Sequence, residues 1–396
     1  MNTQKAFLGS AIVFYFIIGL EVLIMISPFA GFFYSIFNPF LLEIAGHWAT
    51  SWLCAFFLPH MTLPSDGLLR FIRVMGSVTF IAGVCAFLVC AIEVYASKGM
   101  KRGTVVRGLY RYIRHPQYVA LAVAGVGLSI LWPRFLSVFL WLVMILAYYF
   151  LARDEERRMI KAHGQGYGKY LERTGMFLPK VVENALHLRN APSKGVFFIF
   201  IVVMTIGGGF FLRAYTIDHL TTWKNDNLLA LAILPQDSTM LEHRMPDILK
   251  LSEVTSRLNA KGDYLVYLMP RHYIMQGMIA DTGEDWKLYK KHHTLGMITD
   301  WILHPDSHLS DSHHHGHDLS MQQGDDAEKS PFTRRLIFLK LFGRSGSGIR
   351  DIKPFSIDTQ RIPYFMLDIN VHTLSQVSVK DLEPTTGWGR VPTPMF

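Results

Sequence analysis

The chain has 396 residues with a formal net charge of +8, and half of its residues are hydrophobic. This composition excludes a soluble protein with a single core, so part of the chain is expected to lie in lipid. The positive charge belongs to residues 1–213, with 20 Lys and Arg against 9 Asp and Glu, whereas residues 214–396 hold 19 against 22. Because basic residues beside membrane spans set their orientation, this charge does not indicate a nucleic-acid partner.

Six apolar runs are long enough to span, or nearly span, about 30 Å of hydrocarbon. They cover residues 6–27, 44–58, 71–96, 118–131, 135–152 and 196–212. The first run lacks the basic segment and the cleavage site of a signal peptide, so we interpret it as a retained span. The sequence therefore predicts a mainly α, polytopic helical membrane protein with about six membrane segments.

The charges around these runs predict the orientation of the chain. Residues 97–117 hold six Lys and Arg and no acid, which places this loop in the cytoplasm by the positive-inside rule. Arg70 and Arg73, at the other end of the preceding run, oppose this assignment but are outnumbered. The next two runs then form a short helical hairpin that returns to the cytoplasm, and the last run leads outward. Residues 214–396 are expected to be extracytoplasmic, in a protein of a bacterial inner membrane.

Beyond the last run the sequence has the pattern of an appended α/β domain. Short apolar runs predict strands over residues 229–234, 264–269, 336–341 and 364–369, and looser helical spacing covers residues 240–258 and 285–303. The expected domains are N-terminal membrane helices over 1–70, a core with a cytoplasmic tail over 71–194, a last membrane helix over 195–213, and the α/β domain over 214–396. We find no nucleophile motif, phosphate-binding loop or dinucleotide fingerprint in the last of these, which leaves a protein partner as one expectation for it.

A His-rich stretch in this domain, residues 304–318, is a candidate metal-binding loop. Its candidate ligands are His304, His308, His313, His314, His315 and His317. Imidazoles at this density suit zinc, copper or nickel, but their spacing defines no rigid site. A flexible loop that binds metal weakly is therefore favoured over a catalytic centre. Cysteine supplies no further ligand set, because Cys54, Cys85 and Cys90 all lie in apolar runs.

Basic and aromatic residues gather just before the predicted hairpin. They form the pattern Gly108-x-Tyr110-x-x-x-Arg114-His115-Pro116-x-Tyr118, the hairpin closes on Glu155-Glu156, and the tail continues as Gly166-Tyr167-x-x-Tyr170-x-x-Arg173-x-x-x-Phe177-x-Pro179. Each of these residues also has a structural interpretation. Basic residues beside a span commonly set its topology, His-Pro commonly ends a helix, and a Glu pair at a helix end is commonly solvated. The ordered combination, expected at one membrane face, favours a pocket for a charged small molecule.

This combination resembles the isoprenylcysteine carboxyl methyltransferase and phospholipid methyltransferase superfamily. The resemblance covers roughly residues 70–180, under a third of the chain, and Ala120 stands where the family often has glycine. It implies an S-adenosylmethionine pocket at the cytoplasmic ends of the membrane helices, with a lipid-like acceptor that enters from the bilayer. Such methyl transfer depends on in-line approach and exclusion of water more than on a metal.

The resemblance also implies roles for individual residues. The expected cofactor-binding residues are Tyr110, Arg114, His115, Pro116, Tyr118, Glu155, Glu156, Tyr167 and Tyr170. As a hypothesis, Glu155 or Glu156 accepts hydrogen bonds from the ribose or the amine. His115 and Tyr118 hold the methionyl end, and the other three tyrosines line the adenine or close the site. The candidate catalytic residues are Glu156 and Arg173, with Arg173 holding an acceptor carboxylate.

The sequence thus predicts an integral-membrane methyltransferase that depends on S-adenosylmethionine and acts on a lipophilic small molecule in contact with membrane lipid. A prenylcysteine-like carboxyl group, a lipid amine headgroup and a small thiol remain open as acceptors, and Arg173 favours the first. The rival hypothesis is a membrane assembly or metal-handling protein. In that hypothesis an inactive methyltransferase core is a scaffold, and the His-rich outer domain binds a partner or an ion.

Overall fold

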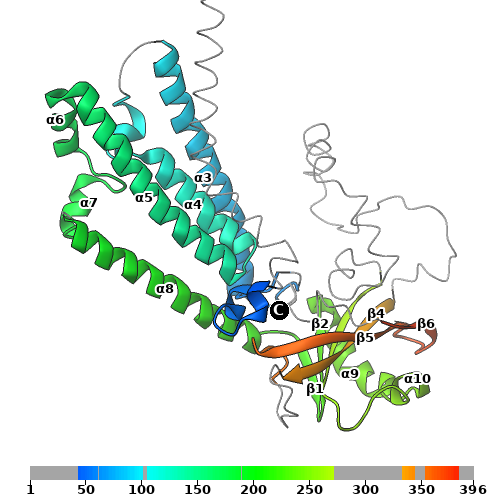
Figure 1. The fold of residues 1–396 in the computed structure, drawn as a ribbon. Helices are drawn as coiled ribbons and strands as arrows, with labels where there is room; N and C mark the ends of the chain where they lie inside the picture. Colours follow the sequence, from blue (N-terminus) through cyan, green and yellow to red (C-terminus); the bar gives the residue numbers. More distant parts are fainter. Residues whose placement is uncertain are drawn as a thin grey trace, which may run out of the picture. The chain divides into compact units, whose positions relative to one another are not determined.

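The computed structural model describes residues 43–60, 62–100, 105–188, 190–271, 332–343 and 353–382. They fall into two compact units, one of Met1–His60 with Asp66–Asp218 and one of Met61–Ser65 with His219–Phe396. The first unit is helical, and the second is built on a β-sheet (Figure 1). The chain therefore combines a mainly helical unit with a separate α/β unit.

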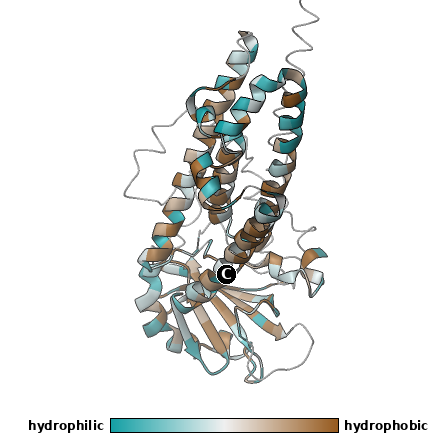
Figure 2. Ribbon diagram, turned by 90° about the vertical axis from the view of Figure 1, so that its left-hand side faces the viewer, coloured by the Kyte–Doolittle hydropathy of each residue, from teal (hydrophilic) through white to brown (hydrophobic). Residues whose placement is uncertain are grey.

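Three helices of the described residues are long and apolar enough to cross a membrane. They are α3 (Gly67–Gly99), α5 (Phe135–His163) and α8 (Ala191–Asp218). Apolar residues extend along much of each helix (Figure 2). The apolar runs predicted over residues 71–96, 135–152 and 196–212 are thus confirmed as long helices.

A fourth apolar helix, α4 (Pro116–Leu131), is only 16 residues long and packs against both α3 and α5. Its contact with α3 is made by small residues. A Cβ added to Gly83 of α3 would lie 2.4 Å from the backbone nitrogen of Ala124, and one added to Gly127 would lie 2.3 Å from that of Phe80. Small side chains at such positions let the backbones of membrane helices approach closely. Together α4 and α5 form the predicted short hairpin.

One expected membrane segment, residues 44–58, does not form a long helix, so the prediction of a span there is wrong. It contains the short 3-10 helix η1 (Ser51–Cys54) and then continues in extended form. The amide of Phe57 donates a hydrogen bond to the carbonyl of Pro133 at 2.8 Å. The run is shorter than the roughly 20 residues that a span needs, and its apolar side chains from Leu53 to Leu58 are buried in the protein, whereas Trp48 is exposed. The run over residues 6–27 lies outside the described residues, so a count of six spans is not confirmed.

Three short helices lie at the end of the first unit where α4 begins and α5 ends. They are η2 (Gly108–Arg111), α6 (Gln165–Arg173) and α7 (Lys180–Ala185). Helix α6 follows α5 directly after Gly164, which has a positive φ of +52° (Figure 1). Glycine adopts this backbone conformation without steric cost, so the chain turns sharply there. Tyr110 lies in η2, and Tyr167, Tyr170 and Arg173 lie in α6.

The second unit contains a six-stranded sheet with the strand order β1-β2-β3-β4-β5-β6. The strands are β1 (Thr222–Asn225), β2 (Leu228–Ala232), β3 (Tyr264–Pro270), β4 (Thr333–Gly343), β5 (Thr359–Asn370) and β6 (Gln376–Asp381). Strands β2 and β3 are parallel, and the other neighbouring pairs are antiparallel. The four strands predicted from short apolar runs are confirmed as β2 to β5.

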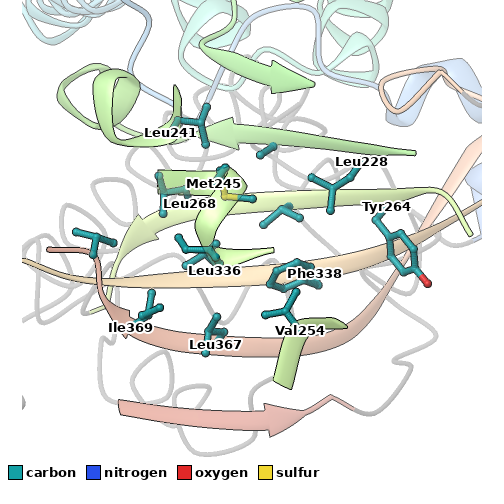
Figure 3. Close-up of a cluster of buried hydrophobic side chains, with 14 of the residues drawn as sticks. Leu228, Leu241, Met245, Val254, Tyr264, Leu268, Leu336, Phe338, Leu367 and Ile369 are labelled. Atoms are coloured by element: carbon teal, nitrogen blue, oxygen red, sulfur yellow. The ribbon is translucent and has the colours of Figure 1, made fainter. Parts of the chain in front are cut away.

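Three short helices connect the parallel strands β2 and β3 along the chain, and they contribute the helical layer on one face of the sheet. They are η3 (Pro235–Asp237), α9 (Ser238–Ile248) and α10 (Ser252–Thr255). Met245 of α9 and Val254 of α10 point toward Leu336 and Phe338 of the sheet and share one buried core with them (Figure 3). The helix expected over residues 240–258 is split because the backbone of Leu251 is extended.

Candidate functional site

The segment that leads into α4 begins at Gly108, where the backbone conformation favours glycine. Gly108 has a positive φ of +55°, a region that favours glycine. A Cβ at this position would also lie 2.7 Å from Oε1 of Glu93, on α3. The segment ends at His115, and Pro116 occupies the first turn of α4, where its missing N–H is not needed. The Glu93 carboxylate therefore lies directly against the start of this segment.

The tail after α6 runs alongside the same segment. The amide of Arg114 donates to the carbonyl of Gly175 at 2.9 Å, and the amide of His115 donates to the carbonyl of Met176 at 3.2 Å. Glu183, in α7, also holds this tail in place, because its Oε1 accepts a hydrogen bond from the amide of Met176 at 2.6 Å. Backbone pairing therefore holds Arg114 and His115 at the open end of the hairpin.

Arg114 ties this segment to the end of α5. Its Nε lies 2.5 Å from Oε1 of Glu156, and the two side chains are 8% and 14% exposed. Its Nη1 also donates to the carbonyls of Leu171, at 3.3 Å, and Thr174. Charge-assisted hydrogen bonds of this kind are stronger than neutral ones, and the guanidinium plane fixes their directions. A single guanidinium therefore joins three parts of the chain.

His115 lies between two carboxylates. Its Nε2 is 3.4 Å from Oε1 of Glu156, and its Nδ1 is 3.4 Å from Oε2 of Glu155. Burial of the ring opposes the charged imidazolium, but the hydrogen bonds and charges of Glu155 and Glu156 outweigh burial and raise the pKa of His115. Contact with a carboxylate at each nitrogen requires a proton on each, so this environment favours the doubly protonated ring.

Aromatic rings surround the charged residues. The hydroxyl of Tyr170 donates to the carbonyl of Tyr110 at 2.6 Å, and the rings of Tyr167 and Tyr170 are 5.7 Å apart. Tyr118 stacks on His115 at 5.6 Å and on Tyr148 of α5 at 4.9 Å. Burial raises the pKa of Tyr170 to about 12, so its phenol is protonated and can donate at neutral pH. These rings form flat apolar surfaces beside the ion pairs.

The hydroxyl of Tyr110 is buried and has no hydrogen-bond partner among the described residues. Burial, first, and then the charges of Cys90, Glu155 and Glu93 raise the pKa of this phenol. A buried hydroxyl without a partner is costly, so such groups usually meet water or a ligand. Tyr110 is therefore a donor that is still available between carboxylates of α3 and α5.

The structure brings most of the predicted site residues together. They are Tyr110, Arg114, His115, Pro116, Tyr118, Glu155, Glu156, Tyr167 and Tyr170. Arg173 is different, because it is exposed at the end of α6 and no hydrogen bond or ion pair of the described residues joins it to this cluster. Its assignment to an acceptor carboxylate remains a prediction.

The candidate metal ligands in residues 304–318 lie outside the described residues, as does the helix expected over 285–303. Among the residues that the structure does describe, no group of three His, Cys, Asp or Glu side chains is arranged to hold a metal ion. Metal binding by the His-rich loop therefore remains a prediction.

Two carboxylates of this site were not expected from the sequence. The position of Glu93, near the end of a predicted span, gave no sign that it contacts Gly108. Glu183 acts on a backbone amide, which no side-chain pattern reveals. One signal was present for Glu93, because an acid in an otherwise apolar helix is costly unless it has a partner.

Residues 74–166 match the family model for phospholipid methyltransferase. This segment contains most of α3, all of η2, α4 and α5, and the beginning of α6. No curated protein and no solved structure matches the chain significantly. The resemblance seen in the sequence is confirmed for this segment, and it coincides with the residues that form the charged cluster.

Proposed function

We propose that this integral membrane protein transfers a methyl group from S-adenosylmethionine to a lipophilic acceptor, because residues 74–166 match the family model for phospholipid methyltransferase. The observation that carries the proposal is the position of His115 between Glu155 and Glu156, with Arg114 on the same carboxylate. This cluster lies at the ends of apolar helices, inside the segment that matches the family.

The polar groups of the cluster fit such a donor. The contacts of Glu156 in the described region all use Oε1, and the contact of Glu155 with His115 uses Oε2. One oxygen of each carboxylate is thus left to accept hydrogen bonds from a ribose hydroxyl or an ammonium group. The buried hydroxyl of Tyr110 supplies a donor to the same region. When bound, S-adenosylmethionine supplies an electrophilic methyl group on a sulfonium.

Arg114 and His115 act mainly as positioning residues in this proposal. Nε and Nη1 of Arg114 donate to three acceptors of the protein, and His115 is held by both carboxylates. They fix Glu155 and Glu156 before a ligand arrives, which lowers the entropic cost of binding and reaction. Tyr118 packs behind His115 and limits the access of water from that side.

The acceptor is proposed to be lipophilic because the site lies at the ends of apolar helices that are long enough to cross a membrane. A prenylcysteine-like carboxyl group and a lipid amine headgroup are the two candidates. Arg173, exposed at the end of α6, would hold a carboxylate but would repel a protonated amine. We favour the carboxyl group for this reason.

The basic loop over residues 97–117 supports a cytoplasmic location for the site, with residues 214–396 on the other side of the membrane. We propose this orientation for a bacterial inner membrane, where the donor is cytoplasmic. Single cysteines at Lys98 and Asp226, labelled in intact cells by a reagent that does not cross the membrane, test it. We expect labelling only of the cysteine at position 226. Labelling only of the cysteine at position 98 would indicate the opposite orientation.

Labelled methyl donor added to membranes that contain the protein tests the function. We expect a labelled lipid product whose formation falls at least about 100-fold for Glu156→Gln, since positioning and charge each contribute about this much. Asp154→Asn is the matched control, because Asp154 lies two residues away on α5 and is exposed. Normal binding of S-adenosylmethionine by Glu156→Gln, with normal product, would refute the assignment. Absence of both product and binding in the unaltered protein would refute the function.

A further inference from the structure

A second cluster of cationic and aromatic side chains lies at the other end of the first unit. Helix α4 runs from Pro116, beside His115, to Leu131, a length of about 24 Å at 1.5 Å per residue. Arg134 follows this end of α4 and precedes the first residue of α5. The cluster is therefore separated from the charged site above by the whole length of the hairpin.

Arg134 is almost completely buried, at 1% exposure. Within the described residues, neither Nε nor Nη1 finds a hydrogen-bond acceptor. The guanidinium lies over the ring of Phe56, with its central carbon 4.4 Å from the ring centroid. Burial lowers the pKa of Arg134 to about 10. The charge of Cys54 opposes this shift, and no carboxylate of the described residues contributes to it. Arg134 is still a cation at neutral pH, and it has no counter-ion among the described residues.

Two other residues, linked to Arg134 through a shared effect on His60 or through the backbone, also have buried donors without acceptors among the described residues. They are Nη1 of Arg73, on α3, and Nε1 of Trp132. His60 lies among these groups, with its ring 4.4 Å from that of Trp132. Burial and the charges of Arg73 and Arg134 lower the pKa of His60 to about 4, so His60 is neutral at physiological pH. In the described part of the chain, the cluster thus combines two positive charges with four buried nitrogens that lack acceptors.

The backbone around this cluster is held firmly. Phe56 and Arg134 form an antiparallel bridge, and the amide of Phe135 donates to the carbonyl of Ala55 at 3.0 Å. Arg213, on α8, donates to the carbonyl of Phe56. The donors without acceptors are therefore presented by a fixed framework and not by a frayed chain end.

A buried cation without a partner is strongly destabilising, so an acceptor is expected from outside the described residues. A phosphate group fits this need, because its several oxygens accept from two guanidinium groups and an indole at once. We propose that Arg73, Trp132 and Arg134 form a binding site for a phosphate group at the end of the hairpin opposite the methyl-transfer site. Such a site explains why Arg73 lies at the membrane end where the charge pattern disfavours basic residues.

A lipid headgroup and free phosphate present the same chemistry, so the experiment has two arms. The full chain in uncharged detergent is titrated with inorganic phosphate at constant ionic strength, and separately with micelles that contain phosphatidylglycerol. Diacylglycerol, which lacks phosphate, is the control for the second arm. We expect a saturable rise of the unfolding temperature in at least one arm. A response to phosphate alone identifies the free ion, and a response to phosphatidylglycerol identifies a headgroup; both support the site.

Arg134→Gln is expected to weaken the response about 10-fold to 100-fold, the effect of losing charged hydrogen bonds. Arg70→Gln removes the same charge from an exposed position one turn before Arg73, and we expect a change below about twofold. Arg73→Gln, at a half-buried position, tests the site should Arg134→Gln not fold. Without ligand, Arg134→Gln should unfold at a higher temperature than the unaltered protein, because an unpaired buried charge is lost.

Two results would overturn the proposal. One is the absence of any rise of the unfolding temperature with either phosphate probe. The other is an equal loss of response in Arg70→Gln and in Arg134→Gln, which would indicate attraction to the general surface charge. Neither measurement depends on methyl transfer, so the outcome is independent of the function proposed above.

Discussion

Arg114 and Glu156 are 42 residues apart in the sequence, yet Nε of the first lies 2.5 Å from Oε1 of the second. The hairpin of α4 and α5 lies between them, so the pair closes its open end. Because Arg114 also binds the carbonyls of Leu171 and Thr174, the tail after α6 is fixed by the same group. The position of the carboxylate therefore depends on a residue that precedes both helices.

A double-mutant cycle with Arg114→Gln and Glu156→Gln measures the strength of this pair. We expect a coupling free energy of about 1–3 kcal/mol, because both partners are largely buried and the hydrogen bond is charge-assisted. The measurement is the unfolding free energy of the four proteins in mixed micelles.

Helix α5 supplies a matched control pair for this cycle. Asp154 and Arg158 form an ion pair at 3.2 Å, but their side chains are 61% and 71% exposed. Exposed pairs of this kind contribute less than about 0.5 kcal/mol. A coupling for Arg114 and Glu156 that is no larger than the coupling of this pair would contradict a role in holding the hairpin closed.

His115 should make the stability of the protein depend on pH. Its folded-state pKa is raised above the ordinary value of 6.5 by Glu155 and Glu156, against the effect of burial. Its contribution to stability is therefore complete below pH 6.5 and is lost as the pH rises through the raised value. The difference in unfolding temperature between the unaltered protein and His115→Gln should shrink between pH 6.5 and pH 9. His163→Gln, an exposed control on α5, should show no such trend.

Gly175 is expected to tolerate no side chain. A Cβ there would lie 1.8 Å from the carbonyl oxygen of Leu178 and 2.8 Å from the carboxyl carbon of Glu183. Gly175→Ala must therefore displace the tail that pairs with Arg114, at a cost of about 1–3 kcal/mol in unfolding free energy. Gly168→Ala is the control, because nothing lies within 4 Å of its Cβ and alanine favours the helix. Equal stabilities of the two variants would contradict this packing.

The parts of the fold that depend on local pattern were predictable. The long apolar helices follow from the length of each apolar run, and strands β2 to β5 follow from short apolar runs. The polar cluster was predictable from the order of its residues along the chain, because a hairpin brings its two ends to the same level. Residues 44–58 show the limit, since an apolar run has the same composition whether lipid or protein covers it.

Contacts that use backbone atoms or one particular helix face were not predictable. Thr174 contributes a carbonyl to Arg114, and any residue type provides one. Arg114 and Arg173 belong to similar basic and aromatic patterns, but one is buried in the cluster and the other is exposed. The difference depends on where α6 ends and how the tail returns to pair with the segment before α4, which are tertiary features.

The close approach of α3 and α4 supports the site from the membrane side, and Gly127 is its most sensitive point. A Cβ at Gly127 would lie 2.3 Å from the backbone nitrogen of Phe80, and backbone atoms of a long helix cannot move aside as a side chain does. We expect Gly127→Ala to lower the unfolding free energy by about 1–3 kcal/mol by separating the helices. Gly207→Ala, on α8 with nothing within 4 Å, makes the same change without a clash and should not lower the unfolding free energy. An unchanged stability of Gly127→Ala would mean that the two backbones are not in contact, and the support of His115 by α4 would then need another source.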